Sequence, residues 1–236
     1  MFQGFQSALN TLLIPPTVIV WNSKIDADVV SLYNHFYSLG SIPLRKGAHY
    51  NKQAHSNIVQ QLFATSEPLD SYLDFGCGDC NRTETIASAL GIDDYYSCDI
   101  AKQNGRGFFL VEANNPAIPS GFPQQYDLVS LLNVIHHIPS FCTTHLDFIA
   151  SITKKYLLIR EHDSIEDSAF IKGYHIPFAC MENQPLSYID DITLYSASEL
   201  ETILWPHFRK VRATSPVNTQ RTYYALYQRT NHLASK

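Results

Sequence analysis

The sequence predicts an α/β domain with a mostly parallel β-sheet, and three observations support this. Short apolar runs alternate along the chain with segments of helical periodicity, as in β-α-β units. The clearest unit starts at Tyr72, where an apolar run enters a glycine turn, a helix-like segment follows, and a second apolar run ends at Asp99. Two late apolar runs are separated by Pro216 and Asn218, which indicates a closing antiparallel hairpin. The expected fold is therefore Rossmann-like, with helices on both faces of the sheet.

Each expected element follows from a local pattern. Apolar spacing of three to four residues predicts helices at 25–39, 51–63, 82–90 and 141–153. A capping box, Ser196-Ala-Ser-Glu199, opens a further helix that runs to Leu204. Apolar runs predict strands at 73–76, 95–99, 107–112, 126–133 and 156–160, followed by a pair at 210–214 and 221–228.

Length and composition fit one domain spanning residues 1–236, with 45% apolar residues to form its core. The net charge of −5 gives no general nucleic-acid footprint. No signal peptide or membrane-spanning run is expected, so we predict a soluble, cytoplasmic protein. The five cysteines are scattered, and Cys77-x-x-Cys80 has no second C-x-x-C, so no metal site is expected.

The glycine turn indicates the cofactor. The dinucleotide pattern G-x-G-x-x-G fails here, because Asn81 stands at its third glycine. The pattern [D/E]-x-G-x-G-x-G, typical of S-adenosylmethionine sites, fits Asp74, Gly76 and Gly78, with Cys80 at its last glycine. A carboxylate before the turn repels a pyrophosphate but suits a cationic amino group and sulfonium. The alternative is a tight strand-helix turn whose acid caps a neighbouring helix.

The motifs at Leu73-Asp-Phe-Gly-Cys-Gly-Asp, at Asp99 and at Tyr126-Asp-Leu-Val-Ser-Leu-Leu-Asn resemble those of class I S-adenosylmethionine-dependent methyltransferases. The similarity covers residues 72–228. It implies a seven-stranded sheet with one antiparallel strand, a catalytic core at 67–236, and an N-terminal helical lid at 1–66.

The same resemblance implies residue roles. Gly76, Cys77 and Gly78 would lie along the methionine half of S-adenosylmethionine, with Asp74 before them. Asp99 would hold the ribose, and Ile100 would pack on the adenine. Asn133 would lie beside the methyl-transfer centre. Many relatives read the adenine amino group with an acid after the third strand, and Asn114 is the nearest substitute here.

A second similarity suggests the acceptor. The run Leu158-Ile-Arg-Glu-His-Asp163, with His175 and Tyr195-Ser196 downstream, resembles methyltransferase-like proteins of large DNA and RNA viruses. This implies an RNA cap or RNA end as the acceptor. Two alternatives remain open: a small-molecule methyltransferase, favoured by the net acidity, and a non-catalytic scaffold of the same fold, favoured by Cys80.

Catalytic candidates follow the strand ends, which face the ligand crevice in open α/β sheets. His136 and its neighbour His137 follow the fourth strand, and Glu161, His162 and Asp163 end or follow the fifth. A histidine there can take a proton from an acceptor hydroxyl near neutral pH. The alternatives are a helix-entry turn for the histidine pair and an ion pair with Arg160 for the acids.

Cap ribose methyltransferases use a Lys-Asp-Lys-Glu tetrad, and Lys46 and Glu161 could be its outer members. The fourth strand ends in Asn133-Val-Ile-His136 and has no aspartate there. This is evidence against ribose methylation by such a tetrad, and it leaves guanine methylation open. The long segment 164–195 contains Tyr174, His175 and Phe178. It is expected to be an acceptor-side insertion, although packing of a long loop on the core would explain it as well.

Overall fold

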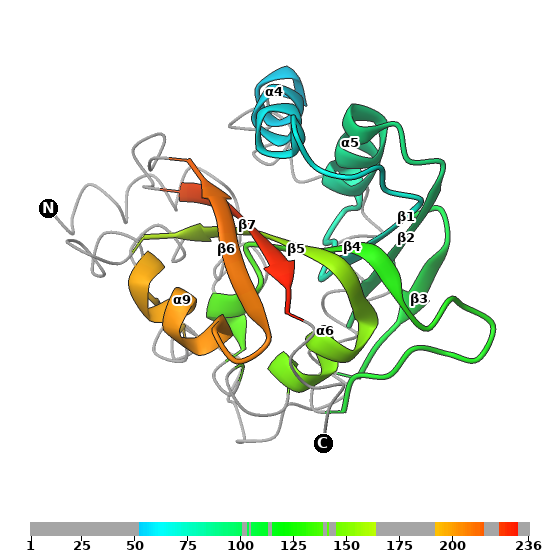
Figure 1. Cartoon of the computed structure of the whole chain (residues 1–236). Coiled ribbons are helices and arrows are strands. Elements are labelled where there is room, and N and C mark those ends of the chain that lie inside the picture. Colours follow the sequence, from blue (N-terminus) through cyan, green and yellow to red (C-terminus); the bar gives the residue numbers. More distant parts are fainter. Residues whose placement is uncertain are drawn as a thin grey trace, which may run out of the picture.

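The computed structural model of the protein describes residues 52–100, 103, 105–112, 115–138, 141, 145–163, 192–214 and 222–230. Seven strands form one sheet in the order β3-β2-β1-β4-β5-β7-β6 (Figure 1). Their bounds are β1 Ser71–Phe75, β2 Asp94–Asp99, β3 Phe108–Leu110, β4 Tyr126–Leu132, β5 Thr153–His162, β6 Phe208–Ala213 and β7 Thr222–Arg229. The predicted number of strands is confirmed.

Strand directions also match the expectation. Strands β1 to β5 pair in parallel, whereas β7 pairs antiparallel with both β5 and β6. The carboxyl ends of the parallel strands and the amino end of β7 therefore lie at the same edge of the sheet. In open α/β sheets this is the edge at which ligands bind.

Helices cover both faces of the sheet (Figure 1). Helices α4 (Lys52–Phe63) and α5 (Asn81–Leu90) pack over one face, in a core that includes Leu158 of β5 and Leu226 of β7. On the other face, α6 (Leu146–Ile152) and α9 (Ala197–Leu204) pack with Ile159 and Ala225. Consecutive residues of β5 thus point into different cores, as strand geometry requires.

The boundary between α6 and β5 differs from the prediction. The helix expected at 141–153 is α6, which begins at Leu146, and the strand expected at 156–160 already begins at Thr153. The hydroxyl of Thr153 donates to the carbonyl of Ile149 over 2.6 Å, which closes the helix, while the Thr153 backbone is extended and pairs with Tyr126. A β-branched residue that bonds back to the preceding turn is well suited to this change.

The other element boundaries agree with the sequence within a few residues. The capping box is present, because the Ser196 hydroxyl accepts from the Glu199 N–H over 3.2 Å and the Ser196 N–H donates to the Glu199 carboxylate over 2.7 Å. The helix expected at 25–39 lies outside the described residues. So do most of the expected lid and residues 164–191 of the expected insertion. Among the helices that the structure describes, none has the length and apolar character needed to cross a membrane.

Candidate active site

The glycine turn lies between β1 and α5, at the ligand-binding edge. The N–H groups of Gly76 and Cys77 both donate to the carbonyl of Cys98 on β2, over 2.8 and 3.0 Å. Gly76 has a φ of +75°, and a Cβ on it would lie 2.6 Å from a methyl carbon of Val134. Only glycine fits this place, because the backbone is left-handed and the loop after β4 touches it. The turn is thus held between β2 and the end of β4.

Cys80 occupies the position where the cofactor pattern has its last glycine. Its φ is 57°, the left-handed conformation that glycine adopts without strain, and it is the N-cap of α5. Its Sγ lies 2.7 Å from the Sγ of Cys77, and both side chains are buried. The backbone at Cys80 therefore keeps the left-handed conformation of the glycine that it replaces. Within the described part of the chain, no three His, Cys, Asp or Glu side chains group as metal ligands.

Asp99, the last residue of β2, contacts the turn directly. Its carboxylate accepts a hydrogen bond of 2.8 Å from the N–H of Gly78. The side chain is largely buried, and the half-buried Ile100 follows it. Asp99 therefore lies against the glycine turn, and the cofactor roles of Asp99 and Ile100 stay predictions. Asn114 lies outside the described residues.

Asp74 lies beneath the turn and not on its surface. Only 1% of it is exposed, and its two carboxylate oxygens accept from the hydroxyls of Thr83 and Ser130, each over 2.6 Å. Burial raises the pKa of Asp74 to about 6. The carboxylate thus joins β1 to α5 and to β4 under the turn. Ser130 and Thr83 were not singled out from the sequence, although a serine inside the apolar run of β4 was a signal for such a partner.

Asn133 follows β4 directly and has a φ of 64°. Its N–H donates to the carbonyl of Arg160 over 2.7 Å, and its side-chain oxygen accepts from the Arg160 guanidinium. A guanidinium only donates, so the amide orientation is fixed and Nδ2 lies toward His162, 3.4 Å from Nε2. The guanidinium of Arg160 also lies over the ring of Tyr224, and an ion pair between Arg160 and the acids that follow it stays a prediction.

Glu161 holds the loop that follows β4. One carboxylate oxygen accepts from the N–H groups of Val134 and Ile135 over 2.9 and 2.7 Å, and the other lies 2.5 Å from Nδ1 of His136. Burial lowers the pKa of His136 well below its usual value and raises that of Glu161. A neutral imidazole that donates from Nδ1 to a carboxylate satisfies both groups. His136 and His137 lie in a short 3-10 turn, Ile135–His137.

The predicted residues therefore gather at one edge in three groups. The glycine turn contacts Asp99, the Asn133 amide lies between Arg160 and His162, and Glu161 pairs with His136. The His136 and His162 rings are 5.3 Å apart between centroids, so the last two groups are adjacent. Lys46 and the aromatic residues of the expected insertion lie outside the described part of the chain.

Comparison with known proteins identifies the family of this chain. Residues 48–207 match a family model described as a methyltransferase domain. A search of curated proteins finds no match.

Solved structures with this fold include the N-methyltransferase NodS from Bradyrhizobium japonicum in complex with S-adenosyl-L-homocysteine (TM-score 0.57, 10% identity, 86% of this chain and 99% of that one). Another is the magnesium protoporphyrin IX methyltransferase ChlM from Synechocystis, also with S-adenosylhomocysteine (TM-score 0.53, 15% identity, 86% and 95%). A third is the plantazolicin methyltransferase BpumL with a substrate analogue and S-adenosylhomocysteine (TM-score 0.51, 13% identity, 86% and 98%).

The family model spans well over half of the chain, and the sheet order and the glycine turn agree with it. The chain belongs to the methyltransferase domain family and is a class I methyltransferase whose cofactor is S-adenosylmethionine.

Proposed function

We propose that the protein transfers the methyl group of S-adenosylmethionine to a nitrogen or oxygen atom of a small-molecule acceptor. The observation that carries this proposal is the meeting of the glycine turn, Asp99 and the loop after β4 at the carboxyl edge of the sheet. That edge is where a ligand of an open α/β sheet binds.

The resemblance to the family implies the cofactor roles. The Gly76 to Gly78 backbone lies along the methionine half, in a turn that packs against Val134 of the loop after β4. Asp99 holds the ribose hydroxyls, with its orientation fixed by the Gly78 N–H, and Ile100 packs on the adenine. Asp74 acts from beneath by ordering the turn, since both of its oxygens bond hydroxyls.

The transfer step needs mainly alignment, because the sulfonium is already a strong methyl donor. We assign Asn133 to the transfer centre, where Arg160 fixes its amide. Glu161 acts by holding His136 and the loop after β4, because accepting a proton from an acceptor would require it to give up these bonds. His136, neutral at physiological pH, and His162 are then the candidates for receiving an acceptor proton.

A small molecule is favoured over RNA as the acceptor. The three structural neighbours described above are an N-methyltransferase, a magnesium protoporphyrin IX methyltransferase and a plantazolicin methyltransferase. The basic side chains of β6 already have partners: Arg209 lies over Trp205, Lys210 pairs with Glu201, and Arg212 donates to the end of α4. The net charge of −5 also gives a polyanion little attraction.

Calorimetry with S-adenosylmethionine tests the cofactor site. We expect S-adenosylmethionine to bind the wild-type protein, and we expect Asp99→Ala to abolish this binding. Asp127→Asn should preserve it, because Asp127 is also a buried carboxylate but lies near the amino end of β4, at the opposite edge of the sheet. Absence of binding in the wild-type protein would favour the non-catalytic scaffold and overturn the proposal.

Transfer of a tritiated methyl group then tests the acceptor. The panel contains small amines, hydroxy compounds and carboxylic acids, together with short capped and uncapped RNAs. Incorporation into a small molecule supports the proposal. Incorporation confined to capped RNA, with a rate that falls steeply as salt is added, would replace it by the RNA acceptor.

A further inference from the structure

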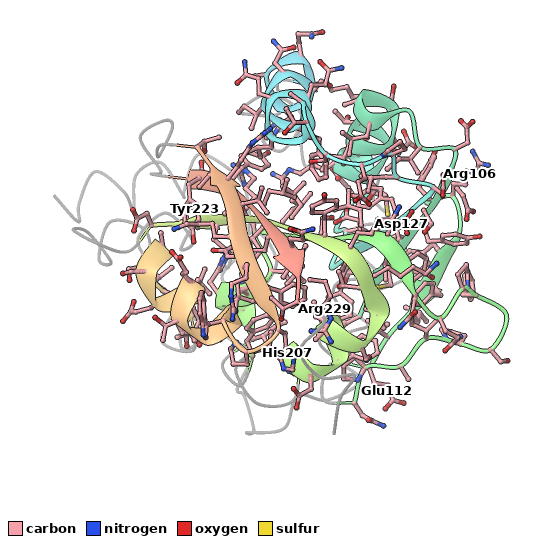
Figure 2. All side chains as sticks on the ribbon, in the orientation of Figure 1. Arg106, Glu112, Asp127, His207, Tyr223 and Arg229 are labelled. Carbon is pink, nitrogen blue, oxygen red and sulfur yellow. The ribbon has the colours of Figure 1, made fainter. Side chains whose placement is uncertain are left out.

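Asp163 and Tyr223 both lie at the ligand-binding edge, at the adjoining ends of the neighbouring strands β5 and β7. Asp163 follows the last residue of β5, and Tyr223 is the second residue of β7, opposite Glu161 in the antiparallel register. Because side chains alternate along a strand, Glu161 and Tyr223 point to the α6 and α9 face, and Tyr223 belongs to the core on that face. Figure 2 labels Tyr223 where β5 and β7 approach α9.

Both side chains are buried and carry a polar atom without a partner. Asp163 is 5% exposed and Tyr223 is 3% exposed. Among the described residues, neither the Oδ1 of Asp163 nor the hydroxyl of Tyr223 meets a hydrogen-bonding group. A buried polar atom without a partner costs about 1–3 kcal/mol, so each such atom needs an explanation, and a bound ligand is one.

The electrostatics of the pair define what would bind there. Burial raises the pKa of the Tyr223 phenol, and Tyr227 and the carboxylates of Glu161 and Asp163 raise it further. Tyr223 therefore stays protonated, in a field that two nearby carboxylates make negative. Such a field attracts a cation and repels an anion. An ammonium group brings three donors for the carboxylate and phenol oxygens.

We propose that Asp163 and Tyr223 form a recognition site for a protonated amine carried by the acceptor molecule, separate from the atom that is methylated. Asp163 accepts one N–H of the ammonium group and the Tyr223 oxygen accepts another. This inference rests on the proposed function, because it places the acceptor at the edge of the sheet where Asn133 and His162 also lie. It selects acceptors that carry a cationic amine.

Binding of simple probes to the protein saturated with S-adenosylhomocysteine tests the site. Benzylamine, benzyl alcohol and benzoate share one ring and differ in the charge of the attached group. We expect benzylamine to bind at least tenfold more tightly than benzyl alcohol, and benzoate not to bind. Asp163→Asn should weaken benzylamine at least tenfold, and Tyr223→Phe about threefold. Equal affinity for amine and alcohol, or an unchanged affinity in Asp163→Asn, would overturn the proposal.

Two matched variants control for loss of buried polar groups. Asp127 is as buried as Asp163 but pairs with Lys155, and Tyr126 also has a buried hydroxyl without a partner among the described residues. Both begin β4, at the opposite edge (Figure 2 labels Asp127). Asp127→Asn and Tyr126→Phe should leave benzylamine affinity unchanged. A loss in these variants equal to that in Asp163→Asn and Tyr223→Phe would overturn the site.

A stability measurement separates recognition from a structural role. Asp163→Asn should raise the Tm of the protein without ligand, because it removes a buried charged group whose Oδ1 lacks a partner, whereas Asp127→Asn should lower it. A lower Tm in Asp163→Asn would make Asp163 a structural residue. Affinity for S-adenosylhomocysteine is measured first in each preparation. If S-adenosylhomocysteine fails to bind, the proposed function fails. The amine site is then tested separately, by measuring the affinities of the three probes for the protein without S-adenosylhomocysteine.

Discussion

The Nδ1 atom of His136 and the Oε2 atom of Glu161 lie 2.5 Å apart, which joins the loop after β4 to the carboxyl end of β5. The other oxygen of the same carboxylate accepts two backbone N–H groups of that loop. One buried side chain thus sets the path of the chain between Asn133 and His136. The position of Asn133, which we propose for the transfer centre, therefore depends on a residue of the neighbouring strand.

Removal of the Glu161 carboxylate should lower turnover with little effect on cofactor affinity. Glu161→Ala leaves two N–H groups and an imidazole buried without their acceptor, so we expect kcat to fall at least tenfold and stability to fall by about 3–5 kcal/mol. Glu161→Gln keeps an acceptor for the loop and should recover most of the stability. Steady-state rates, urea unfolding and calorimetry measure the three effects. Equal turnover in Glu161→Ala would assign the residue a purely structural role.

Substitution at Gly76 should disrupt the turn through Val134. We expect Gly76→Ala to cost about 2–5 kcal/mol, the sum of left-handed strain and a methyl collision, and to weaken S-adenosylhomocysteine binding. Gly91→Ala is the matched control, because Gly91 has a φ of +67° with open space around its missing Cβ. It should cost only about 1–2 kcal/mol.

The double variant Gly76→Ala with Val134→Ala isolates the collision. It should be more stable than the sum of the two single changes predicts, because the smaller side chain makes room for the added methyl group. Urea unfolding of the four proteins gives the coupling energy. Strict additivity would mean that Val134 does not limit the turn.

Asp74 should make the protein less stable as the pH rises from about 4 to about 6. Its pKa is about 6 in the folded protein, against 3.8 without burial, so the folded state binds more protons in this window. Its stabilising effect is complete below about pH 4 and is lost through pH 6, which amounts to about 3 kcal/mol.

Asp74→Asn should remove this slope, because the variant has no carboxyl group to titrate at this position. The amide can still bond the hydroxyls of Thr83 and Ser130. The measurement is the urea midpoint of both proteins between pH 4 and pH 7. Burial lowers the pKa of His55 to about 4, which gives a slope of opposite sign, but this contribution is common to both proteins and cancels in the difference. An identical slope in the variant would contradict the assignment.

Arg212 should stabilise α4 from the edge strand β6. Its guanidinium donates to the carbonyls of Gln61 and Leu62, over 3.2 and 3.0 Å, and to the hydroxyl of Thr65. We expect Arg212→Ala to cost about 1.5–3 kcal/mol and to speed amide exchange in α4. Lys210→Ala, which removes an exposed pair with Glu201, should cost less than about 1 kcal/mol. Equal losses in the two variants would show that Arg212 does not hold the helix.

The amino-acid sequence alone is enough to predict the order of the elements, the glycine turn and the acid at the end of β2. These features are local: apolar periodicity, a capping box and the absence of a Cβ act within a few residues, whatever the rest of the chain does. The resemblance to a known family added the seven-stranded sheet and the cofactor roles. Cys80 shows the limit of a pattern, because a non-glycine residue takes the left-handed conformation of the glycine that it replaces.

Which side chains contact one another depends on the three-dimensional fold. It buries Asp74 between Thr83 and Ser130, and it turns Arg160 toward Asn133 while Glu161, the next residue, turns to the opposite face and bonds His136. It also brings the end of β5, which Asp163 follows, beside the start of β7, which contains Tyr223, because β7 enters the sheet antiparallel beside β5. Such pairings depend on strand order and register, which follow from packing the two cores together and are not encoded in any local pattern.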